Sequence, residues 1–181
     1  EYKLVEVPYD IAMKVQSKPI KRVLKSTEEK YSKLVVVDKE HGGKKADGSN
    51  AGINVCSNKY FVCTDVDCII EPMALYRMMW IVLNSHRPVI GVSATMLMSN
   101  GCIVEDGRVV EAAVPNTLVP MFQQLEYLRS FLISKLGWSS INALPNISGG
   151  FGLFDTDVAV KSGGYDPTSM AEDVDLLLRM V

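Results

Sequence analysis

Two groups of acidic residues carry the chemistry that this sequence suggests. Asp65 and Asp67 follow the apolar run Tyr60–Cys63, and alternate residues of an extended chain project to the same side. Both carboxylates can therefore face one hard cation while Val66 faces the core. Such a pair alone is a weak signal, but ligands of open α/β sheets bind beyond the carboxyl ends of strands. We therefore expect Asp65 and Asp67 to hold Mg²⁺ or Mn²⁺.

The second group, Glu172 and Asp173, begins a predicted helix near the C-terminal end. Ser169 and Glu172 match the Ser-x-x-Glu capping box, in which the glutamate reaches back to the N-cap amide. Asp173 has no such structural duty at this spacing. It can interact with the helix dipole, or it can act as a general base that removes a proton from a hydroxyl. A metal held by the first group and a base from the second would suit sugar transfer from a nucleotide diphosphate.

A glycine-rich turn with two lysines, residues 42–45, precedes a helix predicted over 47–57. The turn lacks the Gly-Lys-Ser/Thr ending of a P-loop and does not match the dinucleotide fingerprint. Lysines and glycines before a helix nevertheless suit a diphosphate. The alternative is a solvated charged edge.

The composition is that of a globular protein. The chain has 181 residues, of which 48% are hydrophobic and 22% charged, enough for one domain with a core. A net charge of −2 argues against nucleic acid as a partner. The four cysteines fit no zinc-binding spacing, so we expect small apolar residues in buried strands and a reducing compartment. We expect neither a signal peptide nor a membrane span.

Apolar periodicity and turn signals predict an α/β protein with a mixed sheet. The run 34–37 is typical of a buried parallel strand, and 88–98 of a long strand. Asp106-Gly107 predicts a hairpin turn, and Asp155 a helix cap. The predicted helix 119–136 ends at Gly137 and carries an apolar stripe. The stripe consists of Phe122, Leu125, Leu128, Leu132 and Leu136. The remaining expected elements are strands at 3–7, 20–24 and 60–63, and helices at 71–84 and from 169.

Several segments together carry a resemblance to a known family. They are 34–40 with Lys45-Ala46-Asp47 and Asn50-Ala51-Gly52, then 61–67, 101–107, 148–154, 163–166 and Glu172-Asp173. In this order they resemble the inverting family-2 glycosyltransferases with a GT-A fold. The likeness is greatest to bacterial membrane-integrated members such as poly-N-acetylglucosamine, hyaluronan and cellulose synthases.

The resemblance implies a GT-A-like (Rossmann-like) mixed sheet flanked by helices. It also implies metal-dependent, inverting transfer from a nucleotide-diphosphate sugar, such as a UDP-sugar, to a glycan or other hydroxyl acceptor. Carried over, it makes Asp67 the main metal ligand, Asp65 a ligand or nucleotide contact, and Asp173 the base beside Glu172. The implied substrate-binding residues are Lys45, Asp47, Asn50, Asp65, Ser148, Gly149 and Gly150.

Compared with the family pattern, residues 1–181 correspond to a single partial catalytic domain that lacks the first nucleotide-binding strands. We expect the parent enzyme at the cytoplasmic side of the bacterial inner membrane. The chain itself is expected to be soluble, inactive alone and self-associating through an open sheet edge. Two alternatives stay open. One is a catalytically inactive fragment that binds metal or nucleotide sugar, and the other is a sugar nucleotidyltransferase.

Overall fold

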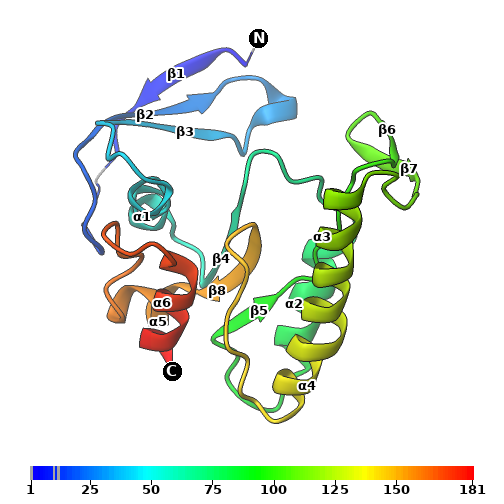
Figure 1. The fold of residues 1–181 in the computed structure, drawn as a ribbon. Helices are drawn as coiled ribbons and strands as arrows, with labels where there is room; N and C mark the ends of the chain where they lie inside the picture. The colour runs from blue at the N-terminus through cyan, green and yellow to red at the C-terminus, as the bar shows by residue number, and fades with distance from the viewer. Residues whose placement is uncertain (1, 10, 12) are drawn as a thin grey trace. The chain divides into compact units, whose positions relative to one another are not determined.

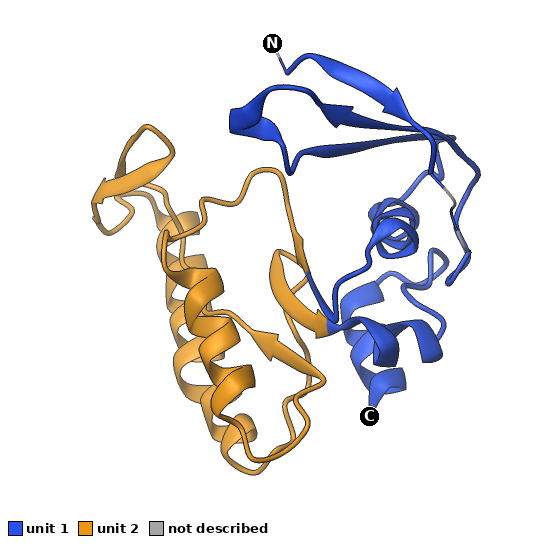
Figure 2. Cartoon of the chain, turned by 180° about the vertical axis from the view of Figure 1, so that it is seen from behind, with its two compact units in different colours: residues 1–61, 155–181 blue, residues 62–154 orange. Residues whose placement is uncertain are grey.

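The chain folds into two compact units, in a computed structural model that describes residues 2–9, 11 and 13–181. Unit 1 comprises Glu1–Phe61 and Asp155–Val181, and unit 2 comprises Val62–Phe154 (Figure 2). The chain enters unit 2 within β4 (Tyr60–Thr64) and leaves it at the end of β8 (Phe151–Asp155). The single partial domain expected over residues 1–181 stays a prediction.

Unit 1 contains an antiparallel sheet in the order β1-β2-β3 (Figure 1). Its strands are β1 (Leu4–Val7), β2 (Ile20–Ser26) and β3 (Val35–Lys39). The 3₁₀ turn η1 (Glu29–Tyr31) lies between β2 and β3. The strands predicted at 3–7, 20–24 and 34–37 are confirmed, but the parallel orientation expected for 34–37 is wrong. A connection this short can join only antiparallel neighbours, because a parallel crossover needs a dozen or more residues.

Three helices complete unit 1, namely α1 (Lys45–Val55), α5 (Thr156–Lys161) and α6 (Glu172–Met180). Asp155 caps α5 as predicted, since its carboxylate accepts a hydrogen bond from the Val158 amide at 3.0 Å. The capping box predicted for α6 is wrong: Ala171 is the N-cap residue, and no side chain caps it. Ser169 Oγ instead accepts a hydrogen bond from the Ala171 amide at 3.2 Å. This local turn competes with the cap for the same hydroxyl.

The buried face of α1 carries polar side chains that are hydrogen-bonded to two distant segments. Asn50 has 0% exposure, and its Nδ2 donates to the carbonyls of Gln16 and Tyr165 at 2.8 Å each. Its Oδ1 accepts a hydrogen bond from the Tyr165 amide, also at 2.8 Å. One turn later, Asn54 Oδ1 accepts hydrogen bonds from the Lys14 and Val15 amides at 2.9 Å. These contacts fix residues 14–16 and 165 against α1.

Unit 2 contains a sheet in the order β4-β8-β5, where β5 (Gly91–Ser93) runs antiparallel to β8. The strand predicted over 88–98 is therefore reduced to three residues. The predicted hairpin is confirmed as β6 (Ile103–Glu105) and β7 (Arg108–Glu111). Its turn has positive φ at Asp106 (48°) and Gly107 (72°), as a type I′ turn requires. The α/β class is thus confirmed, with helix α2 (Ala74–Asn84) following β4.

A continuous helical segment forms one side of unit 2 (Figure 1). It consists of α3 (Leu118–Leu128), the π-helix η2 (Arg129–Ser134) and α4 (Lys135–Ser140). The predicted end at Gly137 is wrong, because Gly137 lies inside α4. The predicted stripe does not enter a core: Phe122 is 68% exposed and Leu125 61%. In the part of the chain that the structure describes, no helix has the length and apolarity that crossing a membrane requires.

We predict that Asn50→Ala lowers the free energy of unfolding by about 3 kcal/mol. The substitution leaves the buried amide and carbonyl of Tyr165 without their partner, and each such loss costs ~1–3 kcal/mol. Urea denaturation followed by circular dichroism measures the change. Gly48→Ala is the matched control in the same helix, because its Cβ would meet open space. The control should stabilise by ~0.5–1 kcal/mol, and a loss below about 1 kcal/mol for Asn50→Ala would contradict the role of Asn50.

Candidate active site

Asp65, Asp67 and Cys68 form a candidate metal centre in unit 2. One ligand atom from each of these residues lies within 4.8 Å of the others. Asp67 is exposed, whereas Asp65 and Cys68 are half-buried. The cluster therefore has an open side on which water or phosphate oxygens can complete the coordination of a metal.

A turn, rather than an extended strand, brings the two carboxylates together. β4 ends at Thr64, and the Cys68 amide donates to the Asp65 carbonyl at 3.3 Å. Val66, which was expected to face the core, is fully exposed. The expected alternation of side chains along an extended strand is wrong at this point. β4 has already ended, so the turn, and no longer the pleat of a strand, sets the direction of each side chain.

The segment 148–150 lies directly against this turn. The Asp65 amide donates to the Gly150 carbonyl at 3.1 Å, and Cys68 Sγ donates to the same carbonyl at 3.3 Å. A Cβ on Gly150 would lie 2.6 Å from Met96 Cε and 3.5 Å from Asp65 Oδ2. Ser148 Oγ is within 3.0 Å of Met96 Sδ. The structure thus brings together the predicted metal ligands and the predicted substrate segment with Ser148, Gly149 and Gly150.

The donor set of this cluster fits a hard divalent cation. Two carboxylates supply the oxygens that Mg²⁺ and Mn²⁺ prefer. The Cys68 thiol donates a hydrogen bond to the Gly150 carbonyl, and hard cations prefer oxygen to sulfur ligands. We therefore expect Asp65 and Asp67 to be the metal ligands, with Cys68 as their neighbour.

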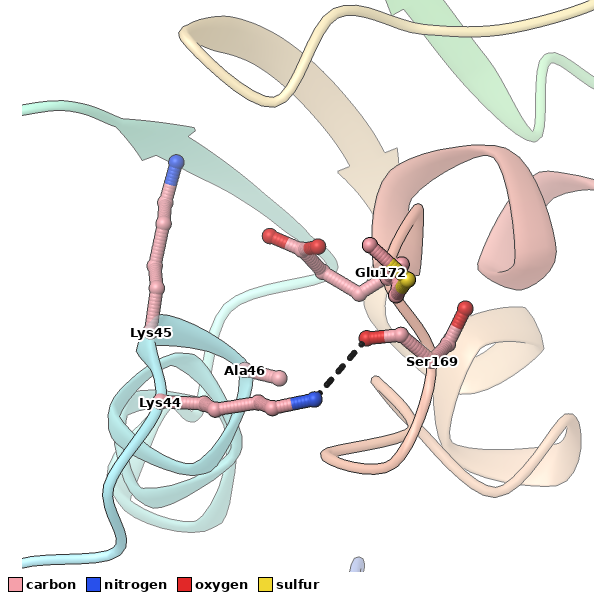
Figure 3. A pocket seen from close by; sticks show the side chains of 6 residues that line it. Lys44, Lys45, Ala46, Ser169 and Glu172 are labelled. Carbon is pink, nitrogen blue, oxygen red and sulfur yellow. Dashed lines mark hydrogen bonds between the residues drawn. The ribbon is translucent and has the colours of Figure 1, made fainter.

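A second site in unit 1 is a cavity of about 360 Å³ between the start of α1 and the start of α6 (Figure 3). Lys44 Nζ donates to the carbonyls of Thr168 and Ser169 at 3.3 and 3.4 Å. Glu172 reaches from α6 toward the side formed by Lys44 and Lys45. The cavity is lined by Lys44, Lys45, Ala46, Ser169, Met170 and Glu172.

The predicted acid pair lies at this end of α6. Glu172 lines the cavity, and both Glu172 and Asp173 are half-buried in the first turn of the helix. Asp173 Oδ1 accepts a hydrogen bond from the Val174 amide at 2.9 Å. Carboxylates in the first turn of a helix interact favourably with the helix dipole.

Asp47 and Asn50, predicted to bind substrate, lie on the buried face of α1. Asp47 forms an ion pair with Lys39, and its Oδ1 accepts a hydrogen bond from the Lys18 amide at 2.7 Å. Burial disfavours the charged form of Asp47, but the bonds from Lys39 and Lys18 outweigh it and lower the pKa of this carboxyl below its ordinary 3.8. Both oxygens of Asp47 are thus engaged in holding α1 to β3 and to Lys18.

Sequence reasoning missed several members of the two sites. Cys68 was expected in a buried strand, yet it lies half-buried in the turn with the two aspartates. The adjacent sequence Asp-x-Asp-Cys was the available signal. Ser169 and Met170 had no signal as cavity residues, because only folding brings them to Lys44.

A comparison with protein families matches a range that contains residues of both sites. Residues 17–94 match the model of Glycosyl transferase family 2. The match spans β2 to β5 and includes Lys44, Lys45, Asp65 and Asp67.

The chain is also similar to curated relatives. It is 26% identical over 141 residues to poly-beta-1,6-N-acetyl-D-glucosamine synthase of Staphylococcus aureus strains COL, MSSA476 and MRSA252. The aligned region covers 78% of this chain and 31% of each relative, so the chain spans about a third of their length. The family-2 match and the names of these relatives support the predicted enzyme class, a glycosyltransferase.

We predict that Asp67→Ala raises the Kd for Mn²⁺ at least tenfold. A single remaining carboxylate provides too little charge for an ion held in an open site. Isothermal titration calorimetry of the 181-residue chain with MnCl₂ measures this change. Glu105→Ala, an exposed carboxylate of the hairpin in the same unit, is the matched control and should leave the affinity unchanged. Equal affinity of Asp67→Ala and the parent chain would rule out this cluster.

We further predict that Asp47→Asn destabilises the chain by about 2–4 kcal/mol at pH 7, because a buried ion pair is broken. Folding lowers the pKa of Asp47, so its charge stabilises the fold above pH 3.8. This stabilisation disappears as the pH falls through the folded-state pKa, and the difference between variant and parent should shrink below pH 3.8. Denaturant titrations at several pH values measure it. Asp38→Asn, from an exposed ion pair with Arg22, should cost at most ~1 kcal/mol.

Proposed function

We propose that this chain is part of the catalytic domain of a metal-dependent, inverting glycosyltransferase. The enzyme would transfer a sugar from a nucleotide-diphosphate sugar, a UDP-sugar in our proposal, to a hydroxyl of a glycan acceptor. A GT-A-like fold belongs to the same proposal. The observation that carries it is the family-2 match, because the matched range contains both the lysine turn and the carboxylate pair.

The name of the relatives supports a polysaccharide product. Poly-beta-1,6-N-acetyl-D-glucosamine synthase is named for a polymer of N-acetylglucosamine, which favours this sugar as the transferred unit. We also propose that the whole protein is integrated in the bacterial inner membrane, with these residues on the cytoplasmic side. The sequence resemblance to membrane-integrated synthases supports this location.

Asp65 and Asp67 are proposed to hold Mg²⁺ or Mn²⁺ through their carboxylates. A divalent ion bound there supplies positive charge for the diphosphate that leaves. The Gly150 carbonyl keeps the segment 148–150 close to Asp65, because it accepts a hydrogen bond from the Asp65 amide. Ser148 and Gly149 continue this wall of the site toward the acceptor.

Lys44 and Lys45 are proposed to attract the phosphate groups of the donor. They stand at the N-terminal end of α1, where the helix dipole adds to their positive charge. Lys44 is held in place by two carbonyls, so its ammonium does not need to be ordered when the donor binds. Asp47 and Asn50 support this end of α1 from its buried side.

Asp173 is proposed to act as the general base. Its carboxylate would accept the proton of the attacking hydroxyl as that oxygen bonds to the anomeric carbon and the diphosphate departs from the opposite face. The configuration is therefore inverted in one displacement. Glu172, which faces the cavity with Lys44 and Lys45, is proposed to set the charge beside the base.

We predict that Asp173→Asn lowers kcat for sugar transfer by ~10²-fold or more, as loss of a general base does. Glu172→Gln should lower kcat less, because it keeps the size and hydrogen-bonding capacity of the side chain while removing its charge. The measurement is steady-state transfer from UDP-N-acetylglucosamine by the whole natural protein that contains these residues. Thermal unfolding of both variants checks that the fold is intact.

Two outcomes would overturn parts of this proposal. Equal and severe loss of kcat in both variants would contradict the division of roles between Asp173 and Glu172. Absence of transfer and of metal-dependent UDP-sugar binding in the folded whole protein would contradict the glycosyltransferase proposal itself.

A further inference from the structure

The Cys68 thiol lies beside the two carboxylates of the candidate metal centre. One ligand atom each from Asp65, Asp67 and Cys68 lies within 4.8 Å of the other two. Within the part of the chain that the structure describes, no other three side chains of histidine, cysteine, aspartate or glutamate come this close together. The carboxylates alone suit Mg²⁺ or Mn²⁺, so the sulfur is the one donor of this cluster that a hard cation does not need.

The backbone that holds Asp65 also holds the sulfur in place. The Gly150 carbonyl accepts hydrogen bonds from the Asp65 amide at 3.1 Å and from Cys68 Sγ at 3.3 Å. The Cys68 amide in turn donates to the Asp65 carbonyl at 3.3 Å. Cys68 is therefore ordered next to Asp65 before any ion binds, and little side-chain entropy is lost when its sulfur becomes a ligand.

Release of the thiol from its hydrogen bond costs little, because the carbonyl keeps another partner. When the sulfur binds a metal, the thiol proton passes to solvent and the hydrogen bond from Sγ to the Gly150 carbonyl is lost. That carbonyl still accepts the hydrogen bond from the Asp65 amide. A thiol is a weak donor, so the lost bond is small beside a metal–sulfur bond.

The three donors can surround a tetrahedral ion. Zn²⁺ binds carboxylate oxygen at about 2.0–2.2 Å and thiolate sulfur at about 2.3 Å, so two of its ligand atoms lie about 3.5 Å apart. Rotation of the exposed Asp67 side chain closes any distance beyond this, while the half-buried Asp65 and Cys68 stay in place. The open side of the cluster leaves a fourth position for water, as in zinc sites with three protein ligands.

This donor set distinguishes two classes of divalent cation. Mg²⁺ requires oxygen ligands and gains nothing from the sulfur. Zn²⁺ and Co²⁺ accept a thiolate together with carboxylates. At the same carboxylate pair, these thiophilic ions therefore have one protein ligand more than Mg²⁺.

We propose that Cys68 is a third ligand of this cluster toward thiophilic divalent cations, and that its sulfur strengthens the preference of the cluster for Zn²⁺ over Mn²⁺ and Mg²⁺. Zn²⁺ then competes with the ion of the proposed transfer reaction for Asp65 and Asp67. This preference rests on the metal site of the proposed function, but it does not depend on sugar transfer.

Co²⁺ reports directly on the sulfur, because a thiolate bound to Co²⁺ gives a charge-transfer band in the near ultraviolet. Titration of the 181-residue chain with CoCl₂ should produce this band. Cys68→Ser should abolish it, while keeping a hydroxyl that can donate to the Gly150 carbonyl. Cys102→Ser is the matched control and should retain the band. Cys102 is a half-buried cysteine beside the hairpin of the same unit, where its Sγ contacts the Ala113 carbonyl at 3.7 Å.

Isothermal titration calorimetry with ZnCl₂ and MnCl₂ measures the preference. Oxygen ligands alone already bind Zn²⁺ more tightly than Mn²⁺, so the informative quantity is the change in the ratio of the two Kd values. Cys68→Ser should raise the Kd for Zn²⁺ at least ~10-fold, since the loss of even an outer-shell partner costs about 10–100-fold in metal affinity. The Kd for Mn²⁺ should stay nearly constant. Circular dichroism checks that each variant is folded.

The outcomes separate the role of Cys68 from the metal site itself. If the chain binds Co²⁺ with an affinity that Asp67→Ala lowers, but shows no charge-transfer band, the role of Cys68 is overturned and the carboxylate site stands. A band that persists in Cys68→Ser, or a ratio of Kd values that this substitution leaves unchanged, overturns that role as well. A folded chain that binds none of Co²⁺, Zn²⁺ and Mn²⁺ overturns both the role of Cys68 and the proposed metal site.

Discussion

The buried amide of Asn50 is the interaction on which the architecture of unit 1 depends. A primary amide both donates and accepts, so one side chain can satisfy the amide and the carbonyl of Tyr165 and a third group on Gln16. No apolar side chain of similar size could do this without leaving polar backbone unsatisfied. Because Tyr165 is held on α1, the chain that leads into α6 returns to the N-terminal end of that helix. The cavity between Lys44 and Glu172 follows from that return.

In unit 2, a backbone carbonyl, rather than a side chain, holds two distant segments together. The carbonyl of Gly150 accepts hydrogen bonds from the Asp65 amide and the Cys68 thiol, and this fixes both ends of the turn that carries the carboxylates. A side chain at position 150 would collide with Met96. Met96 would therefore have to move to admit a side chain at position 150, while the exposed Val66 marks the outer side of the same turn.

Features decided by neighbouring residues could be predicted from the sequence, and features decided by distant contacts could not. The hairpin at Asp106-Gly107 and the Asp155 cap depend on local φ angles and one short hydrogen bond. The Ser169 hydroxyl could accept a hydrogen bond either within a capping box with Glu172 or from the Ala171 amide, and the sequence does not choose between them. The apolar stripe was misassigned because periodicity reports that a face is apolar, not what covers it. The carboxylate pair was found from its spacing, although the turn that joins its members was not.

The π-helix η2 gives the long helical segment an unusual tolerance to changes in length. A π-helical turn is in effect an α-helix with one residue added, accommodated by i→i+5 bonding. A chain shortened by one residue between 129 and 134 could continue as a regular α-helix and still bring Lys135 to Ser93. A one-residue deletion, which would rotate everything beyond it in a regular helix, can therefore be absorbed in η2 while the contact of Lys135 with β5 stays in place.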